Sequence, residues 1–137
     1  MGISRVHLRD RYIDTNDACM EVWLRLLVSA IESTHDKPAW LVAAAAEWNE
    51  VATMGHGFGV IPDLDNVITD ESRRDTVLRL AEAAARRLRE LGDPIPAAVL
   101  NQLGAGPVDS SFTRDVPAAM FQEVADDFIR LVREAPL

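Results

Sequence analysis

Six acidic residues between Pro38 and Ser72 come closest to a recognisable binding chemistry in this sequence. The stretch contains no lysine or arginine, and the whole chain has a formal net charge of -8. A surface of one charge sign attracts and steers a partner of the opposite sign. We therefore expect a surface that binds a basic partner, formed by these acids with a neighbouring histidine and phenylalanine: Glu47, Glu50, His56, Phe58, Asp63, Asp65, Asp70 and Glu71.

The spacing of the same residues argues against metal and phosphate chemistry. The glycines of residues 55–59 are spaced like a phosphate loop, but they follow a predicted helix instead of opening one. The segment from Asp63 to Asp65 begins like a calcium loop, yet Arg74 stands where the twelfth residue, a glutamate ligand, belongs. Glu47 and Glu50 lack the Glu-x-x-His pairs of di-metal bundles. We expect no metal and no cofactor.

Catalytic patterns are equally weak. Cys19 is the only cysteine and lies in an apolar helical run without an activating neighbour, so we expect a buried structural thiol. The segment 109–111 is similar to the Asp-Ser attachment site of carrier proteins, but residues 114–117 break the helix that should follow. The arginines of residues 73–89 alternate with acids, which is typical of a solvated face rather than a nucleic-acid surface. We expect a protein that is not an enzyme.

Composition places the chain among folded soluble proteins. With 137 residues, 48% of them hydrophobic, we expect one domain that spans residues 1–137. The negative net charge excludes nucleic acid and an anionic membrane as default partners. A lone cysteine and the lack of an apolar leader or membrane span predict a cytoplasmic protein. Lys37 is the only lysine beside abundant alanine, which indicates a GC-rich, bacterial genome.

Helices must position the acidic residues. Apolar residues recur at steps of three and four, which predicts an all-α, single-domain bundle of four to five helices with one long glycine-containing loop. The first helix, from Thr15, is expected at the centre of the core. Residues 1–14 show no clean period, and we expect a short helix or an arm packed by Tyr12 and Ile13. The remaining helices are expected over 36–52, 69–91, 96–103 and 117–134.

Capping residues set the expected helix starts. We expect Asp36 to cap the second helix ahead of Pro38, Thr69 to cap the third, and Asp115 to cap the last ahead of its own proline. In the second helix, the small side chains of residues 43–46 favour close approach of another helix.

Three functional hypotheses follow. In size and charge the chain resembles bacterial immunity proteins and antitoxins, which implies an inhibitor that occludes a basic partner, for example a toxic enzyme. In that case the carboxylates steer association and Phe58 supplies a buried anchor. A second hypothesis is a small-molecule binder or enzyme with an apolar pocket lined by Trp40, Trp48 and Phe58 and gated by the glycine loop. A third is a structural protein that self-associates, so that monomer and homodimer both remain open.

Overall fold

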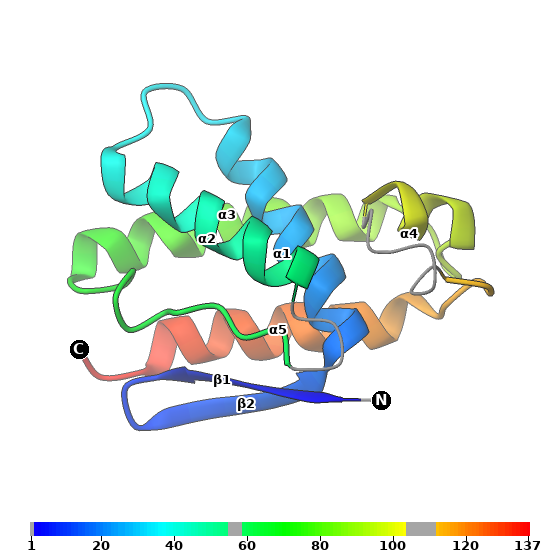
Figure 1. Cartoon of the computed structure of the whole chain (residues 1–137), viewed down its shortest axis with the longest axis horizontal. Coiled ribbons are helices and arrows are strands. Elements are labelled where there is room, and N and C mark those ends of the chain that lie inside the picture. Colours follow the sequence, from blue (N-terminus) through cyan, green and yellow to red (C-terminus); the bar gives the residue numbers. More distant parts are fainter. Residues whose placement is uncertain (1, 55–58, 104–111) are drawn as a thin grey trace.

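The protein is mostly helical and opens with a two-stranded antiparallel hairpin (Figure 1). The computed structural model describes residues 2–54, 59–103 and 112–137, and the elements below lie within those ranges. In chain order they are β1 (Ile3–Leu8), β2 (Arg11–Asn16), α1 (Asp17–Glu32), α2 (Ala39–Met54), α3 (Glu71–Glu90), α4 (Ala97–Leu103) and α5 (Ala118–Glu134).

The hairpin corrects the expectation of a strictly all-α fold. Ser4, Val6 and Leu8 are fully buried, whereas the residues between them are exposed, so β1 has the period-two burial of a strand with one covered face. A two-residue turn joins the strands, and Arg9 in that turn has a positive φ of 57°. The predicted short helix over residues 1–14 was therefore wrong, and the predicted packed arm is this hairpin, in which Ile13 packs against the core but Tyr12 is exposed. The strand period is weak in the sequence because one inward position is the polar Ser4 and the charged residues 9–11 follow directly after Leu8.

The core forms around α1, as the sequence predicted. Its residues Met20, Trp23, Leu24, Leu27 and Ile31 are all buried. In Figure 1, α3 and α5 run side by side and α1 crosses them, while the hairpin lies along α5. Trp23 meets Phe128 of α5 edge to face, with ring centroids 5.6 Å apart. By contrast, α2 makes its extensive contacts with α1 alone, which places it at the side of the molecule.

The helix starts agree with the sequence only in part. The first helix begins close to the expected Thr15, and Asn16 caps it by accepting from the Ala18 and Cys19 backbone N–H groups. The predicted caps of α2 and α3 were wrong. Asp36 has a positive φ of 54° and lies ahead of the helix. Asp70, rather than Thr69, caps α3 through the Arg73 N–H at 2.8 Å.

The starts of α4 and α5 are each capped by an aspartate that lies just before the other helix. Asp93 accepts from the Ala118 N–H at the start of α5, and Asp115 accepts from the Ala97 N–H at the start of α4. Asp115 therefore does not cap the last helix, as expected, but the one before it. An isolated β-bridge between Ile95 and Val116 holds the two helix starts together.

The described part of the long loop, residues 59–70, contains no helix or strand. Val60, Leu64 and Ile68 are buried and attach it to the core. Cys19 is buried, as predicted. Among the described helices, none is long and apolar enough to cross a membrane.

Candidate functional site

The predicted acidic residues lie on three connected segments. Glu47 is half-buried and Glu50 exposed on α2, Asp63 and Asp65 are exposed in the following loop, and Asp70 and Glu71 are exposed at the start of α3. His56 and Phe58 lie outside the described residues. The predicted surface is thus formed from neighbouring segments, and the described members differ in what they contact.

Asp65 is engaged within the chain by Arg9 of the hairpin turn. The Arg9 backbone N–H donates to Asp65 Oδ1 at 2.7 Å, and its guanidinium Nη1 donates to the same oxygen at 2.8 Å. The guanidinium also donates to the Ile68 carbonyl at 2.9 Å. The backbone bond, helped by the guanidinium, holds the pKa of the Asp65 carboxyl below its ordinary value. Asp65 therefore attaches the hairpin to the loop.

Three more acids serve local structure. Asp63 accepts from the backbone and side-chain N–H groups of Asn66, which closes a turn in the loop. Asp70 is the cap of α3, and Glu71 lies 3.8 Å from Arg74 one turn on. Among the described members of the predicted set, Glu50 alone has no hydrogen bond or ion pair with another described residue, and Glu47 has a single hydrogen bond.

Glu47 has one carboxylate oxygen that is hydrogen-bonded and one that is not, and its charged neighbours are acids. Its Oε1 accepts from the Asp63 backbone N–H at 3.2 Å, but its buried Oε2 has no hydrogen-bond partner. Burial raises the pKa of the Glu47 carboxyl above its usual range, and the negative charges of Asp63 and Glu50 add to that effect. An added proton or a cationic donor would relieve both the missing hydrogen bond and the repulsion.

A hollow of about 260 Å³ opens beside Glu47, between α2, the loop and the start of α3. On its α3 side, the Arg73 guanidinium lies over the Trp40 ring, 4.9 Å from the ring centroid, and donates to the Val67 carbonyl at 3.4 Å. The hollow corresponds only in part to the predicted tryptophan pocket, because Trp48 is buried in the core. Its lining comprises Trp40, Ala43, Ala44, Glu47, Asp63, Asn66, Val67 and Arg73.

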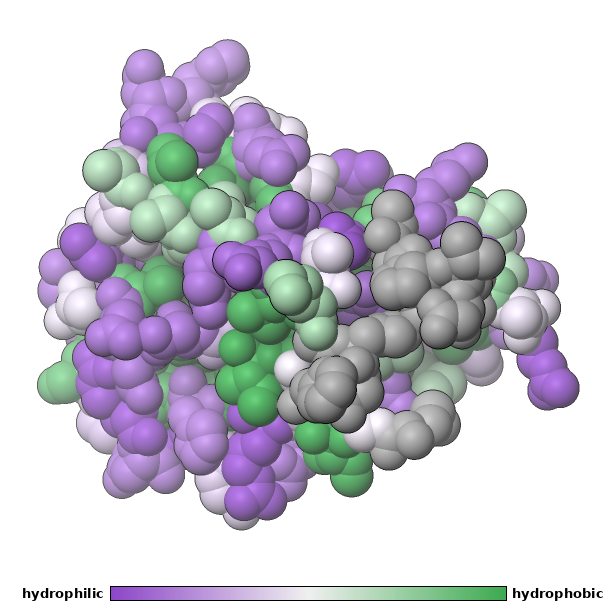
Figure 2. All heavy atoms as spheres, in the orientation of Figure 1, coloured by the Kyte–Doolittle hydropathy of each residue, from purple (hydrophilic) through white to green (hydrophobic). Residues whose placement is uncertain are grey.

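The outer face of α2 adjoins this hollow and is exposed although most of it is apolar. Its residues follow helical spacing and are Ala39, Val42, Ala43, Ala46, Asn49, Glu50 and Thr53. Val42 keeps 50% of its surface exposed. Figure 2 shows green, apolar side chains over α2 and over the loop of residues 59–70, which runs between α2 and the hairpin in this view. The small residues expected to admit a helix are thus only partly covered, since Ala44 is buried while Ala43 and Ala46 face outward.

The charges on α2 are all negative. Its sequence, Ala39–Met54, contains Glu47 and Glu50 and no basic residue. Near the C-terminal end of α2, the Arg25 guanidinium of α1 donates to Asn49 Oδ1 and Thr53 Oγ1. The same guanidinium lies 3.8 Å from the Glu21 carboxylate, which also belongs to α1. The outer face of α2 therefore combines apolar area with unbalanced negative charge. Sequence reasoning selected its acids but missed Val42, although the absence of charged residues from residues 39–46 was a visible signal.

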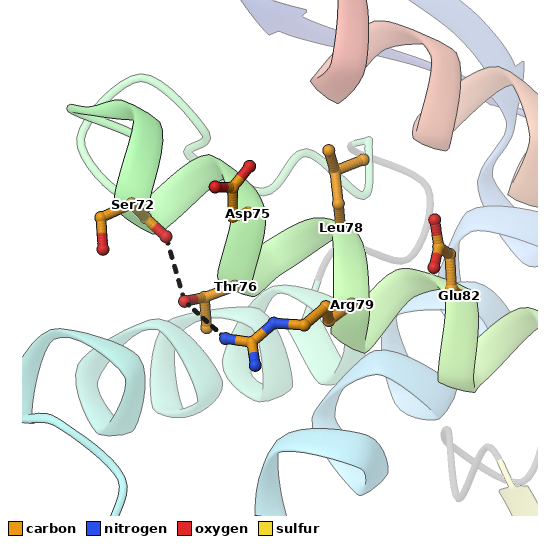
Figure 3. Close-up of a pocket in the computed structure, with 6 residues that line it drawn as sticks. All are labelled: Ser72, Asp75, Thr76, Leu78, Arg79 and Glu82. Atoms are coloured by element: carbon orange, nitrogen blue, oxygen red, sulfur yellow. Dashed lines mark hydrogen bonds between the residues drawn. The ribbon is translucent and has the colours of Figure 1, made fainter.

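A second, larger hollow of about 760 Å³ lies along α3 (Figure 3). Every residue that lines it belongs to that one helix, and its acids are accompanied by Arg79. In the close-up, Arg79 folds back to Thr76, whose hydroxyl donates to the Ser72 carbonyl. A hollow over a single helix surface lacks the converging walls of a ligand site.

Neither metal chemistry nor similarity to known proteins assigns a function. Within residues 2–54, 59–103 and 112–137, no group of three or more potential metal-ligating side chains gathers. Comparison of the chain with family models, curated proteins and solved structures gives no match. The function must therefore be inferred from the surface itself.

Proposed function

We propose that this protein is a small acidic protein-binding module that inhibits a basic partner protein by covering part of its surface. The outer face of α2 is the observation that carries the proposal. It offers exposed apolar residues in its first half, among them Val42, beside carboxylates that have no cation on their own helix. Apolar area supplies affinity in a protein interface, whereas charge complementarity supplies rate and specificity.

The charge of α2 favours a basic partner over a second copy of the chain. Two copies would each bring a net charge of -8, and their α2 helices would bring only carboxylates to a shared contact. Like charges that face each other across an interface cost free energy. A basic protein, such as a toxic enzyme with a cationic substrate-binding surface, turns the same carboxylates into an attraction.

The acids of the loop and of the start of α3 have a supporting role in this proposal. Asp65, Asp63 and Asp70 hold the hairpin, the loop turn and the helix start in place. They fix the conformation of the segments next to α2 and add to the negative potential around this helix. Direct contacts with the partner are assigned to the α2 side, with Glu47 and Glu50 as its charged members.

The test is capture of proteins from a lysate of the source organism by tagged wild-type chain and by two double variants. Val42→Gln with Ala46→Gln removes apolar area and keeps residues that favour a helix. Glu47→Gln with Glu50→Gln removes the charge. The matched control, Glu90→Gln with Asp126→Asn, removes the same charge from exposed positions on α3 and α5.

The proposal predicts one basic protein, retained by wild type and control at low salt and weakened at high salt. Each α2 double variant should retain about tenfold less of it, a loss of about 1.4 kcal/mol of binding free energy. Circular dichroism verifies that all variants fold. An acidic partner, equal retention by all four chains, or no retained protein would overturn the proposal.

A further inference from the structure

The geometry points to the hollow beside Glu47 as a receptor for one lysine or arginine side chain of the basic partner. This inference rests on the proposed function and adds where the partner is anchored and by what chemistry. The hollow opens at the edge of the outer face of α2, because Ala43 belongs to both. A partner that covers the helix would therefore present side chains directly to it.

The walls suit the stem of a long cationic side chain. Trp40, Ala43 and Val67 give the hollow apolar sides, and Glu47 and Asp63 give it carboxylates. Lysine and arginine bury their methylene stems against apolar surface and keep the charged end at a polar site. A volume of about 260 Å³ accommodates such a side chain but is small for most cofactors.

Glu47 provides the unmet interaction. Its Oε2 is buried without a hydrogen-bond partner, whereas both oxygens of Asp63 accept from Asn66. An ammonium or guanidinium group in the hollow would donate to Glu47 in a charge-assisted bond, the stronger kind of hydrogen bond. The raised pKa of the Glu47 carboxyl agrees with a carboxylate that lacks such a donor.

Among the described residues that line the hollow, Arg73 is the one cation, and it reaches from α3 to contacts on α2 and the loop. Its guanidinium covers the Trp40 ring and donates to the Val67 carbonyl, and no ion pair joins it to Glu47 or Asp63. Two carboxylates and one guanidinium leave the lining with an excess negative charge. The Trp40 face also shows that this indole accepts a cation at close range.

The experiment titrates the whole chain with n-butylammonium chloride as a model of a lysine side chain, followed by NMR of backbone and indole N–H groups. Neutral n-butanol and sodium butyrate serve as uncharged and anionic probes of similar shape. Titrations are repeated with Glu47→Gln, which keeps the Oε1 acceptor for the Asp63 N–H, and with the exposed control Glu90→Gln. A third variant, Arg73→Leu, removes the competing cation.

We expect saturable shifts centred on Trp40, Glu47 and Val67 for the ammonium probe, with a Kd on the order of millimolar. Glu47→Gln should weaken binding about fivefold or more, the loss expected for one charge-assisted hydrogen bond. Glu90→Gln should leave the Kd unchanged, and Arg73→Leu should tighten binding of the ammonium probe.

Three outcomes overturn the inference: equal shifts with n-butanol, preferential binding of butyrate, or equal affinity of wild type and Glu47→Gln for the ammonium probe. Preference for butyrate would mark Arg73 as the centre of an anion site. None of these results decides the proposed function, which the lysate capture with the Val42 and Ala46 variants tests by itself. A partner lost by those variants, together with no ammonium binding, would reject the receptor and keep the docking face.

Discussion

At the hairpin Asp14 pairs with Arg5 and Asp65 pairs with Arg9, whereas on α2 neither Glu47 nor Glu50 has an ion pair with any described residue. Both regions are rich in acids, but they use them differently. Asp14 pairs with Arg5, which faces it across the two strands of the hairpin. Asp65 of the loop pairs with Arg9, which is distant in sequence. Among the described residues, Glu47 accepts one hydrogen bond, from the Asp63 backbone N–H, and its charged neighbours Asp63 and Glu50 are both acids.

The two regions also differ in how well their apolar residues are covered. The buried side of β1 is covered by the core, and the loop closes over it where Val60 donates to the buried Ser4 hydroxyl at 2.8 Å. On α2 only Leu41, Ala44, Trp48 and Ala52 are buried, and the opposite face is bare. The comparison indicates that charge in the hairpin region stabilises the fold, while charge on α2 is available to a partner.

The largest expected effect is the difference in the free energy of unfolding between substitutions on the buried face and on the outer face of α2. Trp48 is 1% exposed and Val42 is 50% exposed, although both belong to the same helix. Trp48→Ala should lower the free energy of unfolding by about 3–5 kcal/mol, because it leaves a cavity in the core. Val42→Gln should change it by less than about 0.5 kcal/mol. Urea denaturation of both variants measures the difference.

A loss of more than about 1 kcal/mol for Val42→Gln would contradict this account. It would mean that the outer face of α2 is covered in the free protein, for example by a second copy of the chain. Sedimentation of the wild type at several concentrations then distinguishes a dimer from a monomer.

The next effect is the attachment of the hairpin turn to the loop. Arg9→Ala removes the guanidinium bonds to Asp65 and Ile68 but keeps the backbone N–H bond. We expect a loss of about 1–2 kcal/mol in the free energy of unfolding, reduced from the value of a buried pair because both side chains touch water. The exposed control Glu90→Gln should stay within about 0.5 kcal/mol of wild type. Equal stability of Arg9→Ala and wild type would show that the turn is held by its backbone alone.

The smallest stability effect contrasts Glu47 with Asp65 through pH. The pKa of Glu47 is raised above its ordinary 4.5, so its ionisation costs stability that is regained as pH falls through the raised value. The pKa of Asp65 is lowered below its ordinary 3.8, so its ionisation adds stability that is lost as pH falls through the lowered value. The two residues should therefore respond to acid with opposite signs.

Urea denaturation between pH 7 and 3 measures this contrast. Glu47→Gln should be more stable than wild type at pH 7, by at most about 1 kcal/mol since the group is partly hydrated, and the gain should vanish near pH 4.5. Asp65→Asn should be less stable than wild type at pH 7, with the deficit shrinking below pH 3.8. Parallel curves for all three proteins would refute the assigned surroundings of both carboxylates.

Local pattern in the sequence was sufficient for the helices and insufficient for the hairpin. Buried residues of α1, such as Trp23 and Leu27, recur at helical spacing, and Gly92, just past the end of α3, is typical of a helix stop. The β1 strand offers only Val6 and Leu8 as apolar inward residues, because the third, Ser4, is a buried hydroxyl. A strand of six residues with one polar core position gives a weak period.

Contacts between distant residues limited what the sequence could say about the site. Asp65 looked like a free acid because its partner, Arg9, is 56 residues away. The exchanged caps of Asp93 and Asp115 are hidden for the same reason. Glu47 and Glu50 were identified from the sequence, but the bare apolar face beside them depends on which neighbours pack against α2, and that is a property of the whole fold.

The most direct test of the account is the association rate of the captured basic partner as a function of salt. Stopped-flow measurements would compare wild type, the Glu47→Gln and Glu50→Gln double variant, and the Glu90→Gln and Asp126→Asn control between about 50 and about 500 mM salt. The account predicts a rate for wild type and control that falls by about tenfold or more across this range, and a slower, flatter profile for the α2 variant. The same salt dependence in all three proteins would contradict it, because steering would then come from charge elsewhere on the molecule.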